Sequence, residues 1–121
     1  MLKEDEIEIA VRILREPRTR MDITYLLLLL IPIGRVVSYS VLASILGTTP
    51  RVIARYLAIN RYAPLIPCHR VIGKGGKLGG YKPGGKEMKR RLLNLEGVKI
   101  YRDKVPSYVY FDYELKQLLT S

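Results

Sequence analysis

The first half of the chain repeats apolar residues at the three- and four-residue spacing that is typical of amphipathic helices. This spacing predicts a helix over residues 3–16, in which acidic residues come first and Pro17 ends the pattern. A second helix is predicted over residues 22–31, and its apolar face is wide enough to be well buried. The pattern therefore indicates a chain that begins as a helical protein.

Two further short helices follow, separated by a tight turn. Ser38 is a suitable N-cap for a helix over residues 39–46, and Gly47 is a suitable residue to end it. Thr49 and Pro50 then have the cap and first-turn chemistry of a fourth helix. Two short helices joined in this way predict a helix-turn-helix, although an ordinary helical hairpin fits the same pattern.

The outer face of the fourth helix favours the DNA-binding interpretation. It carries Arg51 and Arg55, with Ala54 between them. Small residues allow a helix to approach a surface closely, and arginines supply contacts to phosphates or bases. We therefore expect these three residues to lie at a nucleic-acid interface.

The second half of the chain has shorter elements. Seven of the ten glycines lie between Gly73 and Gly85, in a basic loop that resembles a wing. The patterns around this loop predict an extended segment over residues 65–72, a helix over 86–96, a β-hairpin from 98–101 and 107–111, and a final helix over 112–119. The predicted fold class is mainly α, a winged helix-turn-helix-like domain with a small β hairpin.

Cys68 is the only cysteine, and the only histidine, His69, follows it directly. A single thiol forms neither an internal disulfide nor a multi-thiolate metal site, so Cys68 is either a buried apolar residue or a nucleophile. His69 has the chemistry of the base that a thiol needs at neutral pH. Because neighbouring side chains on an extended segment point to opposite faces, we expect a water molecule to connect the two.

Charge narrows the set of partners. The 121 residues carry a formal net charge of +10, and residues 70–104 contain eleven basic residues against three acidic ones. A solvated basic surface is one explanation, but the clustering around Cys68 favours nucleic acid. We expect no membrane partner, because the sequence has no spanning segment, no signal peptide and no basic helix with aromatic anchors.

Several separated motifs occur together in the chain. They are Ile31-Pro32-Ile33-Gly34-Arg35-Val36-Val37-Ser38-Tyr39, then Arg51, Asn60, Pro67-Cys68-His69-Arg70-Val71, Tyr81 and Glu96-Gly97. In this order they resemble the O6-alkylguanine-DNA alkyltransferase family, the methylated-DNA–protein-cysteine methyltransferases. The chain departs from the family pattern at Arg61 and Ala63, which puts the shape of the substrate pocket in doubt.

The resemblance implies DNA repair by irreversible, single-turnover transfer of an alkyl group from O6-alkylguanine to Cys68, with no cofactor and no metal. It leaves O4-alkylthymine open as a second lesion. By resemblance, His69 acts through water, Glu96 holds the other ring nitrogen, and Asn60 ties the recognition helix to the active-site strand. Further residues follow by resemblance: Tyr39 and Arg51 for nucleotide flipping, and Tyr81, Val71 and Lys82 for the alkylguanine pocket.

The family also implies binding to double-stranded DNA through the minor groove. We expect residues 1–24 to form a short N-terminal helical extension and residues 25–121 to form the alkyltransferase domain. We expect a monomer that is associated with DNA. We also expect a prokaryotic, cytoplasmic location, because a single thiol fits a reducing compartment. The alternatives are a non-catalytic winged-helix DNA-binding protein or alkyl-lesion sensor, and a cysteine hydrolase, which a chain with one histidine makes less favourable.

Overall fold

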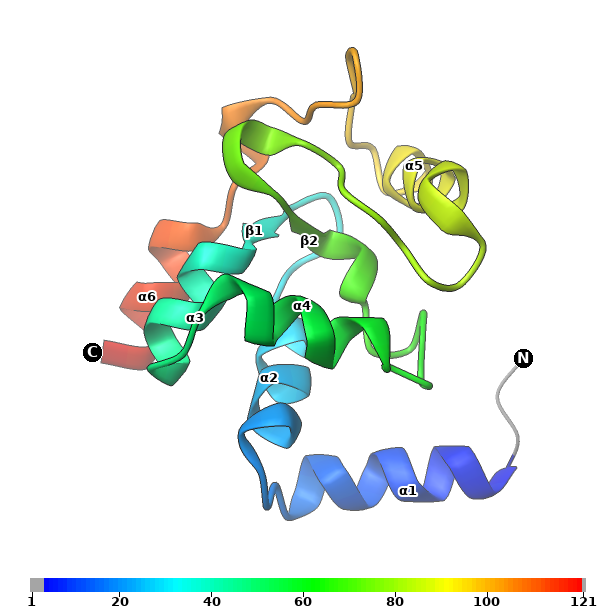
Figure 1. The fold of residues 1–121 in the computed structure, drawn as a ribbon, viewed down its shortest axis with the longest axis vertical. Coiled ribbons are helices and arrows are strands. Elements are labelled where there is room, and N and C mark those ends of the chain that lie inside the picture. Colours follow the sequence, from blue (N-terminus) through cyan, green and yellow to red (C-terminus); the bar gives the residue numbers. More distant parts are fainter. Residues whose placement is uncertain (1–3, 121) are drawn as a thin grey trace.

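The computed structural model of the protein describes residues 4–120, and this part of the chain is mainly helical, as predicted (Figure 1). Its helices are α1 (Glu4–Arg15), α2 (Arg20–Leu29), α3 (Tyr39–Leu46), α4 (Pro50–Ala58), α5 (Gly85–Leu95) and α6 (Asp112–Thr120). In Figure 1, α1 lies at the bottom of the view, α5 at the upper right, and α4 runs across the centre. Among the residues that are described, none of the helices has the length and apolar character needed to cross a membrane.

The predicted helix-turn-helix is formed by α3 and α4. The Ser38 hydroxyl accepts a hydrogen bond from a first-turn N–H of α3, and the Thr49 hydroxyl does the same for α4. These caps satisfy N–H groups that have no partner inside the helix. Gly47 ends α3 in the left-handed region, with φ of 66°, where a side chain would be disfavoured. Local cap and turn chemistry therefore places both helices as predicted.

Helix α2 begins two residues earlier than predicted because Thr19 caps it. The Thr19 hydroxyl accepts a hydrogen bond from the N–H of Asp22 at 3.0 Å, and the Asp22 carboxylate accepts one from the N–H of Arg18 at 2.9 Å. This reciprocal arrangement is a variant of the capping box, in which the carboxylate reaches the N–H of the residue before the cap instead of that of the cap itself. The helix predicted over residues 3–16 is present as α1, and Lys3 lies outside the described residues. A domain boundary after residue 24 stays a prediction.

The small sheet has different strands from those predicted. It consists of β1 (Val37–Ser38) and β2 (Val71–Ile72), which run parallel with Val37 opposite Val71. A parallel pair needs a long crossover connection, and the helix-turn-helix supplies it. The sheet therefore joins the segment before α3 to the segment after the cysteine.

The hairpin predicted from residues 98–101 and 107–111 is wrong. Residues 107–109 form a short 3-10 helix, and Tyr101 bridges only as far as Lys104. The backbone groups of the second predicted strand are used elsewhere. Val36 donates its N–H to the carbonyl of Val109 at 2.9 Å and accepts the N–H of Phe111 at 2.6 Å. Because the carbonyl of Val109 and the N–H of Phe111 are bonded to Val36, they do not pair with residues 98–101 in a hairpin.

The prediction of an extended segment over residues 65–72 is also wrong at the centre of that segment. Pro67 has φ of −82° and ψ of 68°, and the N–H of Cys68 bonds to the carbonyl of Ile66 at 2.9 Å. These values describe an inverse γ-turn, which leads into the 3-10 helix Cys68–Arg70. The cysteine and histidine therefore lie on a tight turn that enters β2, and the opposite-face geometry expected of a strand does not apply to them.

Two buried clusters form the core, and the cysteine turn contributes to the first of them. The first contains apolar residues of α2, α3 and α4 and includes Cys68 itself; its fully buried members include Leu28, Leu42, Ile53, Ile66 and Val71. The second lies under α5 and contains Val36, Ile72, Leu78, Leu93, Val98, Val105 and Val109. Because neighbouring residues Val71 and Ile72 belong to different clusters, β2 joins the two halves of the core directly after the cysteine turn.

Candidate active site

A cavity of about 470 Å³ opens beside the cysteine turn. Its walls come from α3, α4, the turn and the glycine-rich loop, and its lining residues are Tyr39, Ala54, Leu57, Ala58, Cys68, Gly80, Tyr81 and Lys82. Five of these were singled out from the sequence, although they come from segments far apart in the chain. The fold therefore brings predicted interface, nucleophile and pocket residues to one concave site.

Other predicted residues lie outside this lining. Arg51 and Arg55 are exposed on α4, which also carries Ala54 and reaches the cavity. Val71 is fully buried, and its carbonyl is bonded elsewhere. A pocket wall formed by Val71 therefore finds no support in the lining residues. His69, Asn60 and Glu96 are not among the residues that line the cavity.

The surroundings of Cys68 favour the neutral thiol over the thiolate. Its side chain lines the cavity but is only 4% exposed. Burial raises the pKa of Cys68 above its ordinary value, while the Asn60 amide and the Lys89 cation oppose that rise. The thiol thus needs a base before it can react as a thiolate at neutral pH.

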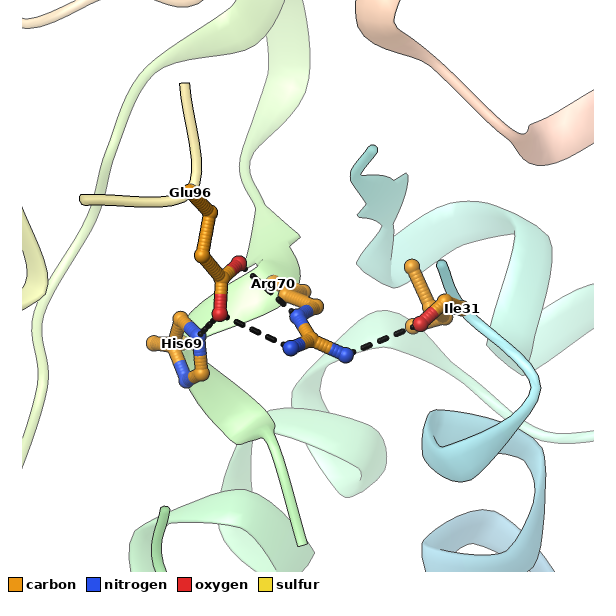
Figure 2. Close-up of polar contacts among 4 residues, drawn as sticks. All are labelled: Ile31, His69, Arg70 and Glu96. Carbon is orange, nitrogen blue, oxygen red and sulfur yellow. Dashed lines mark hydrogen bonds and ion pairs between the residues drawn. The ribbon is translucent and has the colours of Figure 1, made fainter. Parts of the chain in front are cut away.

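His69 is the candidate for that base, and its imidazole points toward the carboxylate of Glu96 (Figure 2). Its Nε2 lies 2.8 Å from Oε2 of Glu96, and the ring is 2% exposed. Because an ionised carboxylate only accepts hydrogen bonds, Nε2 carries the proton and Nδ1 is left as an acceptor. Nδ1 is buried and has no hydrogen-bond partner among the described residues. Burial lowers the pKa of His69, so the ring is neutral and able to accept a proton at neutral pH.

Glu96 stands at the C-cap of α5 and is shared by two partners. Besides His69, it binds Arg70 through both oxygens, at 2.9 Å to Nε and 2.8 Å to Nη2. Burial raises the pKa of Glu96, but the hydrogen bonds from Arg70 and His69 outweigh it and leave the pKa lowered. The carboxylate of Glu96 is therefore ionised at neutral pH.

Asn60 connects the end of α4 to the segment before the cysteine. Its side-chain amide donates to the carbonyl of Ile66 at 2.9 Å, and its amide oxygen accepts the N–H of Tyr62 at 3.0 Å. Asn60 is 7% exposed, so both bonds are shielded from water. These contacts fit the connecting role that the resemblance implies for Asn60.

Lys89 is a site residue that sequence reasoning missed. Its side chain is fully buried, and its Nζ donates to the carbonyl of Val71 at 2.7 Å and to that of Gly80 at 3.5 Å. Burial lowers the pKa of Lys89 to about 8, while Cys68 opposes this. A lysine is almost never fully buried without a partner, and this one joins the nucleophile segment to the pocket wall. Its apolar neighbour at helical spacing, Leu93, was the available signal that this face of α5 is buried.

Comparison with known proteins agrees with this geometry. Over residues 22–98 the sequence matches the family described as 6-O-methylguanine DNA methyltransferase, DNA binding domain. A curated relative from Saccharolobus islandicus, named methylated-DNA–protein-cysteine methyltransferase, is 51% identical over 70 residues, which cover 58% of this chain and 45% of the relative. The chain thus spans about half the length of that relative.

Two solved structures are similar in fold. The crystal structure of O6-methylguanine-DNA methyltransferase from Pyrococcus kodakaraensis has a TM-score of 0.63 and 28% identity, covering 81% of this chain and 66% of that chain. The Mycobacterium tuberculosis protein OGT, crystallised in complex with DNA, has a TM-score of 0.62 and 38% identity, covering 68% of this chain and 51% of that chain. Because the family match covers more than half of the sequence, the chain belongs to the 6-O-methylguanine DNA methyltransferase family.

Proposed function

We propose that this protein repairs O6-alkylguanine in double-stranded DNA by transferring the alkyl group irreversibly to Cys68. One observation carries the proposal. The only thiol of the chain lines a cavity whose other walls come from a helix-turn-helix and the glycine-rich loop, and the adjacent residue, a buried histidine, is paired with a partly buried glutamate. The names of the relatives support the same activity.

The proposed reaction is a displacement at the alkyl carbon. The sulfur forms a bond to that carbon, the bond from the carbon to O6 breaks, and its electron pair stays with guanine. The proton of the thiol passes to His69 and from there to solvent, and guanine takes up one proton from solvent to restore its normal form. The product is a thioether, which no group in the cavity can hydrolyse, so each molecule acts once.

The base acts through its unpartnered nitrogen. In this proposal one water molecule bridges the Cys68 sulfur and Nδ1 of His69, which supplies the missing partner of Nδ1 and carries the proton. Glu96 holds Nε2 and stabilises the imidazolium that forms. This is the nucleophile, base and orienting-carboxylate arrangement of other cysteine chemistry.

Helix α4 is the proposed DNA-recognition element. A stacked guanine cannot reach a thiol that is 4% exposed, so the nucleotide must be rotated out of the duplex. We assign Arg51 to the space that the guanine leaves, Tyr39 to the adjacent phosphate, and Ala54 and Arg55 to close contact with the minor groove. The DNA complex of the M. tuberculosis relative supports DNA as the ligand.

The glycine-rich loop forms the proposed base pocket. Tyr81 is half-buried, lines the cavity, and packs edge-on against His69 with ring centroids 6.4 Å apart. Its ring can stack on the extruded base, and Lys82 lines the same wall. Acceptance of O4-alkylthymine, a monomeric state and a cytoplasmic location stay predictions.

The direct test uses the intact chain and a duplex that contains one O6-methylguanine. Mass spectrometry should find a single added methyl group per molecule, and peptide mapping should place it on Cys68. DNA binding without any adduct would favour the alternative, a non-catalytic winged-helix protein or lesion sensor. An adduct on any other residue would also overturn the proposal.

Replacing Arg51 with alanine should slow alkyl transfer from duplex DNA about 10- to 100-fold, because unstacking a base costs a few kcal/mol that the arginine offsets. Transfer from free O6-benzylguanine needs no unstacking and should be unchanged. The measurement is the ratio of the two rate constants. The matched control is Arg12→Ala on α1, an exposed arginine on another element, which should alter neither rate. Equal slowing with both substrates would remove the flipping role from Arg51.

Replacing Lys89 with methionine should slow transfer about tenfold at neutral pH, the effect of raising the thiol pKa by one unit. The cation lowers the pKa of Cys68, so its loss should move the thiolate titration, followed by ultraviolet absorbance, to higher pH. Lys86→Met, on the same helix but exposed, is the control and should leave the titration in place. An unchanged titration in Lys89→Met would show that Lys89 acts on packing alone.

A further inference from the structure

Arg70 is bound more completely than a surface arginine. All three guanidinium nitrogens donate hydrogen bonds: Nε and Nη2 to Glu96, and Nη1 to the carbonyl of Ile31 at 2.9 Å. The side chain is 13% exposed. Figure 2 shows the guanidinium between the carboxylate and the Ile31 carbonyl, with the imidazole on the other side of the carboxylate. A planar two-point bond of this kind fixes the plane of a carboxylate, which a lysine cannot do.

Glu96 needs such a partner because of its position. It is the C-cap of α5, where the partial negative charge of the helix end disfavours a carboxylate. One hydrogen bond to a neutral imidazole would not offset that repulsion and the burial of the group. The guanidinium supplies the opposing charge, and its bond to the Ile31 carbonyl anchors it to the chain that follows α2.

From this geometry we infer that Arg70 is a positioning residue for alkyl transfer, which locks Glu96 against His69 and partly neutralises its charge. The inference rests on the proposed function, since it assigns a role within that reaction. With Glu96 locked, the proton of His69 stays on Nε2 and Nδ1 stays free to accept. With Glu96 partly neutralised, the imidazole remains unprotonated before the reaction begins.

The charges that face His69 allow the direction of the effect to be worked out. Lys89 on α5 and Glu96 at its C-cap act on the ring, as does Arg70 from its own turn, and the ring of Tyr81 packs against it from the loop. After burial, Glu96 raises the pKa of His69 while Arg70 and Lys89 lower it. Removing the charge of Arg70 should therefore raise the pKa of His69, so that the base becomes protonated at a higher pH.

The test compares Arg70→Met and Arg70→Lys with the unaltered protein. The rate of methyl transfer from a duplex should fall about 10- to 100-fold in Arg70→Met, the usual cost of losing a residue that orients a ligand or base. The acidic limb of its pH–rate profile should move to higher pH by about one pH unit. Arg70→Lys keeps the charge but loses the two-point bond, so its limb should stay in place while its rate falls.

The pKa of His69 can also be read without activity. Because His69 is the only histidine, its imidazole proton resonances can be followed by NMR without ambiguity. Arg70→Lys and Arg70→Gln serve if the methionine variant does not fold, and Arg70→Gln should show the raised pKa. In a Glu96→Gln background, replacing Arg70 should still raise the pKa of His69 through the loss of its charge, but the transfer rate should fall little further, because the carboxylate that Arg70 positions is already gone.

Three outcomes would overturn the inference. They are an unchanged transfer rate in Arg70→Met, a loss that is equal at every pH with no shift of the limb, and a His69 titration that does not move in Arg70→Gln. Failure of the proposed function would be seen separately, as the absence of an adduct in the unaltered protein. The two results are therefore distinguishable.

Discussion

Replacing Cys68 with alanine should abolish alkyl transfer completely and leave binding to duplex DNA intact. No second thiol exists to take the alkyl group, and the exposed residues of α4 that we assign to DNA are unchanged. The substitution leaves a small void in the first core cluster, which costs about 1 kcal/mol of stability. Intact mass after incubation with a methylated duplex, and a binding titration with the same duplex, measure the two properties.

The control for this variant is the unaltered protein blocked beforehand with O6-benzylguanine. Blocking should add one benzyl group and prevent any later methyl transfer, so both samples should be equally inactive. Full transfer by Cys68→Ala would exclude Cys68 as the acceptor. Loss of DNA binding together with transfer would show instead that the alanine variant no longer folds.

Replacing His69 with glutamine should slow transfer about 100- to 1000-fold at neutral pH, the usual contribution of a positioned base. Burial raises the pKa of Cys68, so without the base almost no thiolate is present. In the variant the rate should climb about tenfold for each pH unit as the thiol ionises by itself. In the unaltered protein the rate should instead fall below neutral pH, as His69 gains a proton at a pKa lower than its ordinary value.

The informative comparison is therefore the shape of the two pH–rate profiles. The difference between the proteins should shrink steadily toward alkaline pH. Glu96→Gln provides a graded control, because it keeps the imidazole but weakens its orientation, and it should give an intermediate rate. A His69→Gln defect of the same size at every pH would mean that His69 has a structural role only.

Much of the candidate site could be predicted from the sequence. Cys68 and His69 are unique and adjacent, and the caps Ser38 and Thr49 locate the helices that carry Tyr39 and Ala54. Capping and helical periodicity depend on residues within one or two helical turns of each other, so they can be recognised in the sequence without knowledge of the fold. The resemblance to a known family added Tyr81 and Lys82, which line the same cavity.

Other features depended on contacts between distant segments. Residues 107–111 have a strand-like pattern, yet their backbone pairs with Val36 instead of forming a hairpin. The segment around Cys68 looks extended, yet Pro67 turns it into a 3-10 helix that changes how the thiol and imidazole face each other. A strand pattern specifies a pleated surface but leaves its partner undetermined, and a proline fits both an edge strand and a turn.

The sequence by itself determined the proposed nucleophile, its neighbouring proposed base and the two helices that we assign to DNA binding. Only the tertiary structure decided that Arg70 and Lys89 belong to the site. Both look like members of a solvated basic run, yet Arg70 meets a carboxylate 26 residues away and Lys89 a carbonyl 18 residues away. A charged side chain is buried only where such partners are supplied, and the packing of the whole chain places them there.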